Sequence, residues 1–317
     1  MQRALPARSR SRGGVMGWLT ETSYAGAARR KALLAYLFLS PTLLGILIFT
    51  AGPVVASLGL SLYSWDVISP PVFTGASNYQ QMLHDPEVLL AFGNTFIYVI
   101  LDVTLQAVVG LTLALMMQRK MARWLRTLFR GAFFLPLVMS GVAVSIVMSY
   151  LFSKDQGVIN YYLGLVGIPH IPWLTSTSWA MITVVLASVW QQTGFTFLIF
   201  VGGLANISTE VLEAADLDGA TGWQRLRSIT LPLLSPSILF VAIVGIIGAL
   251  QVFAQPYIMT QGGPGDATRT VVMIIYQDAF QNLQIGYGSA IAMLLFLVIL
   301  AVTAVQFLTS KHWVFYQ

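Results

Sequence analysis

Long apolar runs separated by polar segments set the pattern of this 317-residue chain. Each run reaches or exceeds the roughly 20 residues that an α-helix needs to cross a bilayer. The runs are Leu33–Leu62, Phe92–Met117, Ala132–Phe152, Trp179–Ala205, Ile238–Met259 and Gly288–Leu308. The first is too long for the apolar core of a secretory signal, and no clean cleavage site of small residues closes it. The pattern therefore predicts an all-α integral membrane protein with six transmembrane helices.

Composition supports the membrane interpretation. Charged residues make up 9% of the chain, whereas soluble domains carry about 25%. Cysteine is absent, which excludes disulfides, zinc–thiolate sites and thiol catalysis. We expect residues 1–32, rich in arginine, glycine and serine, to form a disordered basic tail, residues 33–310 to form the six-span domain, and residues 311–317 to form a short cytoplasmic end.

The placement of positive charge orients the predicted helices. Of the 17 lysine and arginine residues, only Lys154 and Arg269 fall in the first, third and fifth loops. The others lie in the N-terminal tail, the second and fourth loops and the C-terminal end. Because positive residues favour the cytoplasmic side, both termini are predicted to be cytoplasmic. The basic residues thus set the orientation of the chain in the membrane. We therefore do not expect a nucleic-acid partner, although a basic chain would otherwise suggest one.

The longest polar interruption in the second half of the chain is Glu213–Pro232. A short helix is favoured through its alanines, with Ser208 or Thr209 as the N-cap. Gly219 permits a sharp turn, and a second short helix is predicted over Trp223–Ile229, ending before Pro232 because proline is costly inside a helix. The residues alone allow two interpretations, a docking loop and an ordinary amphipathic connector resting in lipid headgroups.

The order of residues in this loop resembles that of a known protein family. Its ordered elements are Glu213-Ala214-Ala215, Asp218-Gly219-Ala220, Ile229 and Leu231-Pro232. This gapless pattern resembles the "EAA loop" of bacterial ABC-importer permeases. Further stretches are similar to the carbohydrate-uptake group of that family, of the maltose and glycerol-phosphate type: Phe73-Thr74-Gly75, Leu135-Pro136 and Gly262-Gly263-Pro264.

The resemblance implies the transmembrane domain of a type I importer, with a coupling-helix loop at residues 206–236. The chain would be the first of two non-identical permease subunits in a bacterial plasma (inner) membrane, surrounded by lipid. Its implied partners are the second permease, two ATP-binding subunits and an extracytoplasmic solute-binding protein. The expected solute is a sugar or a sugar derivative such as a glycerol-phosphate compound, and other ABC permeases, for an amino acid or a phosphonate, are the alternative.

The resemblance assigns ATPase docking to residues of the loop. They are Glu213, Ala214, Ala215, Asp218, Gly219 and Ala220. Small alanines allow a partner to approach closely, Glu213 offers a carboxylate to a partner's arginine, and Asp218-Gly219 sets the turn. The competing explanation for the two acids is helix capping and solvation.

Polar side chains inside predicted spans are candidates for a substrate pathway, because sugars are bound through their hydroxyls and by aromatic faces. The candidates are Ser188, Trp190, Gln191, Gln192, Gln251 and Gln255. Ser188, Gln191 and Gln192 match positions that line the sugar site of the maltose-type permease. Gly245, Ala249 and Val252 match its other site positions, where that relative is more polar. Hydrogen bonding between helices is the competing explanation.

Ionisable groups suited to chemistry are few. Asp102 stands alone in the second run, and we interpret it as a partnered structural acid, while a proton-coupled secondary transporter is the alternative. His84, His170 and His312 are scattered over loops and the tail, which argues against a membrane-embedded enzyme. No G-x-x-x-x-G-K-[ST] phosphate loop occurs. We therefore expect no catalytic residue, metal or cofactor in this chain, with ATP and Mg²⁺ held by the partner subunits.

Overall fold

The computed structural model describes residues 16–118 and 122–315, which divide into two compact units after Ala56. The first unit contains α1 (Met16–Ile46), the π-helical turn η1 (Leu47–Ala51) and the start of α2 (Gly52–Leu60). Disorder was predicted through residue 32, but α1 begins at Met16. Alanines in this segment favour helix, and the helix continues without a break into the apolar run. Residues 1–15 of the predicted tail lie outside the described residues.

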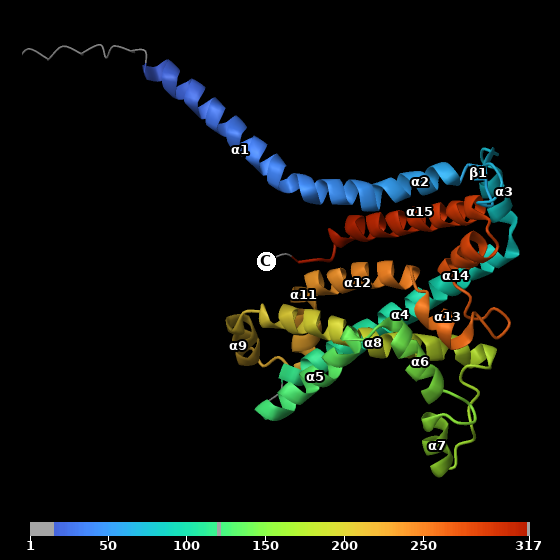
Figure 1. The fold of residues 1–317 in the computed structure, drawn as a ribbon. Helices are drawn as coiled ribbons and strands as arrows, with labels where there is room; N and C mark the ends of the chain where they lie inside the picture. The colour runs from blue at the N-terminus through green and yellow to red at the C-terminus, as the bar shows by residue number, and fades with distance from the viewer. Residues whose placement is uncertain (1–15, 119–121, 316–317) are drawn as a thin grey trace, which may run out of the picture. The chain divides into compact units, whose positions relative to one another are not determined.

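The second unit is almost entirely helical (Figure 1). It opens with a two-stranded antiparallel hairpin, in which Tyr63 pairs with Phe73. The strands are β1 (Tyr63–Ser64) and β2 (Val72–Phe73), and the helices that follow are α3 (Ser77–His84), α4 (Pro86–Gln118), α5 (Arg123–Val138), α6 (Gly141–Leu151), α7 (Val158–Leu165), α8 (Thr177–Ala205), α9 (Thr209–Leu217), α10 (Gly222–Arg225), η2 (π, Leu226–Thr230), α11 (Leu231–Leu233), α12 (Ser235–Leu250), α13 (Ala254–Thr260), α14 (Val271–Tyr276), η3 (π, Gln277–Gln281) and α15 (Ile285–Ser310).

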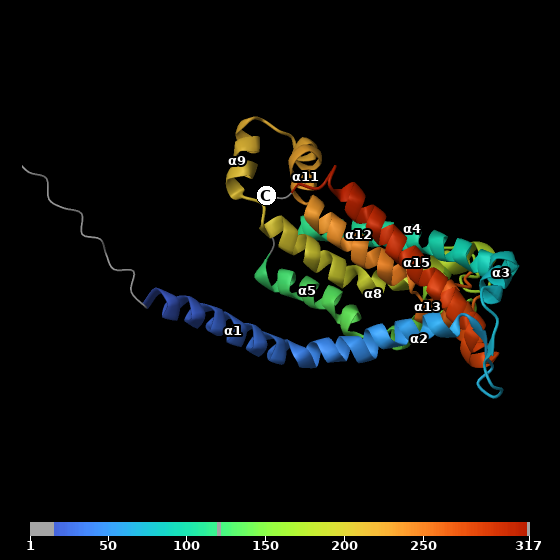
Figure 2. The same cartoon turned by 90° about the horizontal axis from the view of Figure 1, so that it is seen from above.

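Helix α8 is the central element of this unit, and it packs against α4, α5, α12 and α13. Small residues on its surface allow close approach. A Cβ atom at Gly194 would lie 2.1 Å from the carbonyl oxygen of Phe133 in α5, so only glycine fits there. Figures 1 and 2 show α9 at one end of α8, and α3 with the hairpin toward the other end.

Two of the predicted spans are not single helices. The third is divided into α5 and α6, which are bent by 106° around Met139 and Ser140, two residues with extended backbone. The fifth run, predicted as continuous to Met259, is divided into α12 and α13 by a break at residues 251–253. Apolar character along a run does not show whether its backbone stays helical, and here tertiary contacts support the breaks.

The predicted end of a helix before Pro232 is wrong. The helix that starts at Gly222 continues through Pro232 to Leu233, and then bends by 65° into α12. The π-helical turn η2 directly precedes this proline, just as η1 precedes Pro53. Proline lacks an N–H group, and its ring crowds the carbonyl four residues earlier. A wider π turn changes that hydrogen-bonding pattern and lets the helix pass through the proline.

Within the described residues, four helices are long and apolar enough to cross a membrane, or up to six if each bent pair counts as one crossing. The four are Lys31–Leu60, Pro86–Met117, Thr177–Ala205 and Ile285–Ser310. The structure therefore confirms a mostly helical fold with several membrane-length helices, and it adds one short β-hairpin to the predicted all-α arrangement.

Candidate functional site

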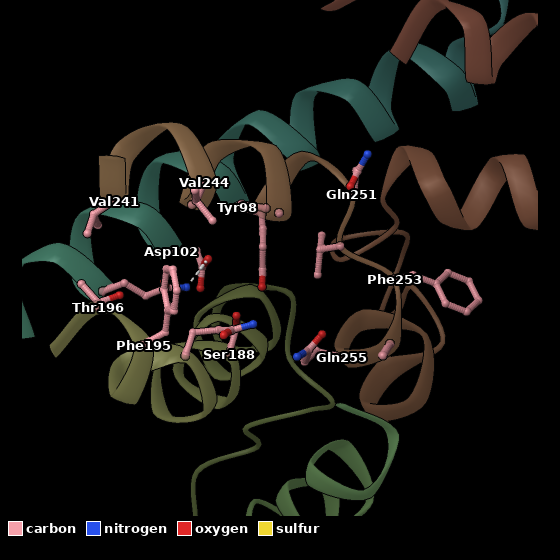
Figure 3. Close-up of a pocket in the computed structure, with 17 residues that line it drawn as sticks. Tyr98, Asp102, Ser188, Phe195, Thr196, Val241, Val244, Gln251, Phe253 and Gln255 are labelled. Atoms are coloured by element: carbon pink, nitrogen blue, oxygen red, sulfur yellow. Dashed lines mark hydrogen bonds between the residues drawn. The ribbon is translucent and has the colours of Figure 1, made fainter. Parts of the chain in front are cut away.

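A cavity of about 410 Å³ lies among α4, α8, α12 and the break that precedes α13. Figure 3 shows its side chains, with Tyr98 and Asp102 reaching from α4 toward Ser188 on α8. Residues of α12, Gly245 and Ala249 among them, form a small and apolar wall. The volume falls in the range of small-molecule sites, which combine an apolar lining with a few convergent polar groups.

The polar wall comes from three segments. On α4, Tyr98, Asp102 and Gln106 are spaced four residues apart, and so they share one face of the helix. On α8, Ser188 and Gln192 have the same spacing. Gln251, in the break after α12, and Gln255, in α13, complete the set. Four of the six predicted pathway residues thus line one cavity, namely Ser188, Gln192, Gln251 and Gln255.

Asp102, predicted to be a partnered structural acid, has a partner for one of its two carboxylate oxygens. Its carboxylate is 2% exposed, and Oδ2 accepts a hydrogen bond of 2.7 Å from Nε2 of Gln106. Oδ1 has no hydrogen-bond partner in the described part of the chain. None of the described residues that line the cavity is basic. The acid is therefore half-partnered, and it lies on the wall of the cavity.

Gln191 lies outside the cavity, unlike the predicted pathway residues Ser188 and Gln192 on the same helix. It is 7% exposed and does not belong to the cavity wall. Its Nε2 donates to the carbonyl oxygen of Met139 at 3.0 Å, and its Oε1 accepts a hydrogen bond from Gln255 Nε2 at 3.0 Å. Thr270 Oγ1 donates to the carbonyl oxygen of Val252, in the break after α12, at 3.1 Å. These side chains satisfy backbone groups that the two helix breaks release.

One further predicted pathway residue does not line the cavity, and some residues that do line it were not predicted. Trp190 is 45% exposed and is not part of the cavity wall. Tyr98 and Gln106 were missed, and Asp102 was not assigned to the pathway. Their four-residue spacing in an apolar run was a signal that could have identified them.

The polar loop has the predicted helix–turn–helix form. Ser208 caps α9, its side chain accepting a hydrogen bond from the Glu210 N–H. Gly219 makes the turn with a φ of +75°, in the left-handed region that favours glycine. A capping box formed by Thr221 and Gln224 starts α10. Arg225 Nη1 lies 2.7 Å from Asp216 Oδ1, so an ion pair joins the two arms of the loop.

The predicted docking residues divide by exposure. Glu213, Ala214, Asp218 and Gly219 are exposed, and Ala220 is half-buried. Ala215 is 5% exposed, so its methyl group packs within this chain.

Two apolar side chains of the loop are exposed that the sequence analysis did not assign to docking. Leu217 is 89% exposed and Trp223 is 68% exposed. Large apolar groups within a polar loop were the available signal, since an exposed apolar surface marks an interaction site.

Side-chain contacts also tie together the opposite end of the second unit. Arg269 Nη1 lies 2.9 Å from Glu87 Oε2, and Asn94 Nδ2 donates to the carbonyl oxygen of Asp266 at 2.7 Å. The Tyr287 hydroxyl donates to Asp85 at 2.7 Å. The start of α4 thereby holds both the loop before α14 and the start of α15. Among the described residues, no cluster of three or more His, Asp or Glu could bind a metal ion.

Comparisons with known proteins agree with these features. Residues 106–312 match the family described as binding-protein-dependent transport system inner membrane component. The chain is 38% identical over 294 residues to the probable ABC transporter permease protein YesP of Bacillus subtilis (strain 168), covering 91% of this chain and 94% of that protein. It is 33% identical to the lactose transport system permease protein LacF of Rhizobium radiobacter, covering 93% and 99%. It is 36% identical to the sulfoquinovosyl glycerol transport system permease protein SmoG of Agrobacterium fabrum, covering 86% and 89%.

A solved structure shares the fold. A chain in the crystal structure of a bacterial alginate ABC transporter, in complex with an alginate pentasaccharide-bound periplasmic protein, superimposes with a TM-score of 0.79 at 22% identity. The match covers 89% of this chain and 95% of that chain. The overall arrangement of the helices is therefore one that another chain also adopts.

Proposed function

Because this chain belongs to the family of binding-protein-dependent transport system inner membrane components, we propose that it is a permease subunit of an ATP-driven importer of sugars or sugar derivatives. The observation that carries this proposal is the cavity, which places hydroxyl and amide groups opposite an apolar wall. Relatives named for the transport of lactose, sulfoquinovosyl glycerol and arabinooligosaccharides support the solute class.

We propose six membrane crossings with both termini in the cytoplasm. Each bent helix pair then counts as one crossing. The positive-inside distribution supports this orientation. The C-terminal segment lies near the polar loop, because the Phe315 N–H donates to Ser235 Oγ at the start of α12, which follows that loop directly. The polar loop is then cytoplasmic, and the end that carries α3 and the hairpin faces outward.

The cavity would form this subunit's part of the solute pathway. Glutamine amides both donate and accept hydrogen bonds, as sugar hydroxyls do. Gln192, Gln251 and Gln255 supply such groups, and the ring of Phe195 offers an apolar face. Gln191 acts as the support of this site, because it bonds Gln255 from outside the cavity.

The loop between α8 and α12 would dock to an ATP-binding subunit. Leu217 and Trp223 are suited to fill a groove, since buried apolar and aromatic anchors carry most of the binding energy at interfaces. Glu213 would pair with a basic residue of the partner, and the Arg225–Asp216 ion pair would keep the two arms together. ATP and Mg²⁺ would then be bound by two ATPase subunits, and a second, non-identical permease and an extracytoplasmic binding protein would complete the assembly.

The test is purification of the tagged chain with its partners, followed by ATPase and uptake assays with a solute-loaded binding protein. We expect Glu213→Lys and Trp223→Ala to lower stimulated ATP hydrolysis at least tenfold while the chain stays inserted. Glu213→Gln, which removes the charge without reversing it, should have a smaller effect. If the chain purifies alone and moves solute into liposomes without ATP, it is a secondary transporter and the proposal is wrong.

A further inference from the structure

One oxygen atom of the cavity wall remains unexplained by the fold. Asp102 is 2% exposed, and its Oδ1 has no partner in the described part of the chain, although Gln106 satisfies Oδ2. A buried polar atom without a hydrogen bond is costly, and so native proteins rarely keep one without a role. Asp102 also lies on the wall of a cavity of about 410 Å³.

The groups that surround this acid carry no compensating charge. Tyr98 and Gln106 lie one helical turn away from it on α4, and Ser188 of α8 lies near it (Figure 3). Gln192 of α8 lines the same cavity. The wall contributed by α12 is apolar. None of the described lining residues is a lysine, arginine or histidine. An ionised carboxylate here therefore has hydrogen-bond donors near it, but no cation.

We propose that Asp102 selects the solute class of this pathway, accepting neutral or amino sugars and excluding anionic ones. This inference rests on the proposed function. A sugar hydroxyl or an ammonium group can donate to Oδ1 and complete its hydrogen bonding. A uronate, phosphate or sulfonate would instead bring a like charge into a site of low dielectric, where repulsion is strong. This chain would thus differ in solute charge from the transporter of the acidic polysaccharide alginate, and also from SmoG, the relative named for sulfoquinovosyl glycerol, whose sulfo group is anionic.

The test uses the assembled transporter and a matched pair of sugars. Binding of galactobiose and of digalacturonate, which differ by their carboxylates, is measured on the purified complex without the binding protein, so that only the pathway selects. ATP-driven uptake is measured in parallel in proteoliposomes. We expect the wild-type complex to bind the neutral disaccharide at least tenfold more tightly than the acidic one. Asp102→Asn should weaken binding of the neutral sugar about 10- to 100-fold, the range for a hydrogen bond to a charged group, and reduce the discrimination.

Asp155→Asn is the matched control, because it removes an exposed acid that lies outside the cavity, and it should leave the preference intact. Elution of the Asp102→Asn complex as a single assembled species shows that the variant folds. Equal binding of both sugars by the wild type, or an unchanged preference in Asp102→Asn, would overturn the inference while ATP-driven uptake still supports the importer. Loss of ATP dependence in the wild type would overturn the proposed function, and the inference with it.

Discussion

Gln255 donates a hydrogen bond of 3.0 Å from its Nε2 to Oε1 of Gln191, and this contact joins the two broken segments of the fold. Gln255 lies in α13, just after the break that ends α12. Gln191 in turn donates to the carbonyl oxygen of Met139, at the break between α5 and α6. A chain of two hydrogen bonds thus runs from one helix break to the other through α8. Because Gln255 also lines the cavity, the support of the breaks and the shape of the site are coupled.

The Gln191 contact can be tested by a double-mutant cycle. Gln191→Leu leaves the Met139 carbonyl and the Gln255 amide without their partner, and we expect a lower thermal stability of the purified complex. The coupling energy between Gln191→Leu and Gln255→Leu should be about 0.6–1.7 kcal/mol, the range found for hydrogen bonds within membranes. Additive effects of the two substitutions would show that the residues act independently.

Thr95 provides a second test, near the N-terminal end of α4. Its side chain is 1% exposed, and its Oγ1 accepts a hydrogen bond of 3.0 Å from the Val271 N–H at the start of α14. Thr95→Val keeps the shape but removes this acceptor, so we expect a loss of about 1–3 kcal/mol of stability. Thr95→Ser retains the hydroxyl and should lose less. Denaturation of the two variants in the same detergent gives the comparison, and equal losses would assign the effect to packing.

Two glycines of α8, one closely packed and one not, provide a matched test of helix packing. A Cβ at Gly194 would lie 2.1 Å from the Phe133 carbonyl oxygen, whereas a Cβ at Gly202 has no neighbour within 4 Å. Gly194→Ala should push α5 away from α8 and cost about 1–3 kcal/mol or more. Gly202→Ala should be neutral or stabilise by up to about 1 kcal/mol, since alanine favours helix. Similar melting temperatures of both variants would contradict this packing.

The Arg225–Asp216 ion pair can be used to distinguish an effect on stability from an effect on stimulated ATP hydrolysis. Its side chains are 40% and 59% exposed, and exposed ion pairs contribute only about 0–1 kcal/mol. Asp216→Ala should therefore leave the melting temperature nearly unchanged. It should nevertheless lower stimulated ATP hydrolysis several-fold, because the two arms of the loop then move independently. The double charge exchange Asp216→Arg with Arg225→Asp should restore hydrolysis, and failure of that rescue would assign another role to Asp216.

The sequence by itself determined the class of the protein and the form of its polar loop. Apolar runs of membrane length, few charged residues and asymmetric basic loops needed no tertiary information. The caps and the turn of the loop, at Ser208 and Gly219, are local features, and local residues specify them. Of the predicted glutamines within apolar runs, Gln192, Gln251 and Gln255 line the cavity, because a polar group there requires a partner or a function.

The tertiary structure decided where the helices break and which polar groups meet. Helix breaks at Met139 and Gln251 depend on donors from α8 and from the segment before α14, which are distant in sequence. The same holds for Asp102, since only the packing of α4 against α8 and α12 shows that it lines a cavity with one oxygen satisfied and the other without a partner in the described part of the chain. Hydropathy reports whether a residue is apolar, but hydrogen bonds between distant segments are set by the packing of the helices.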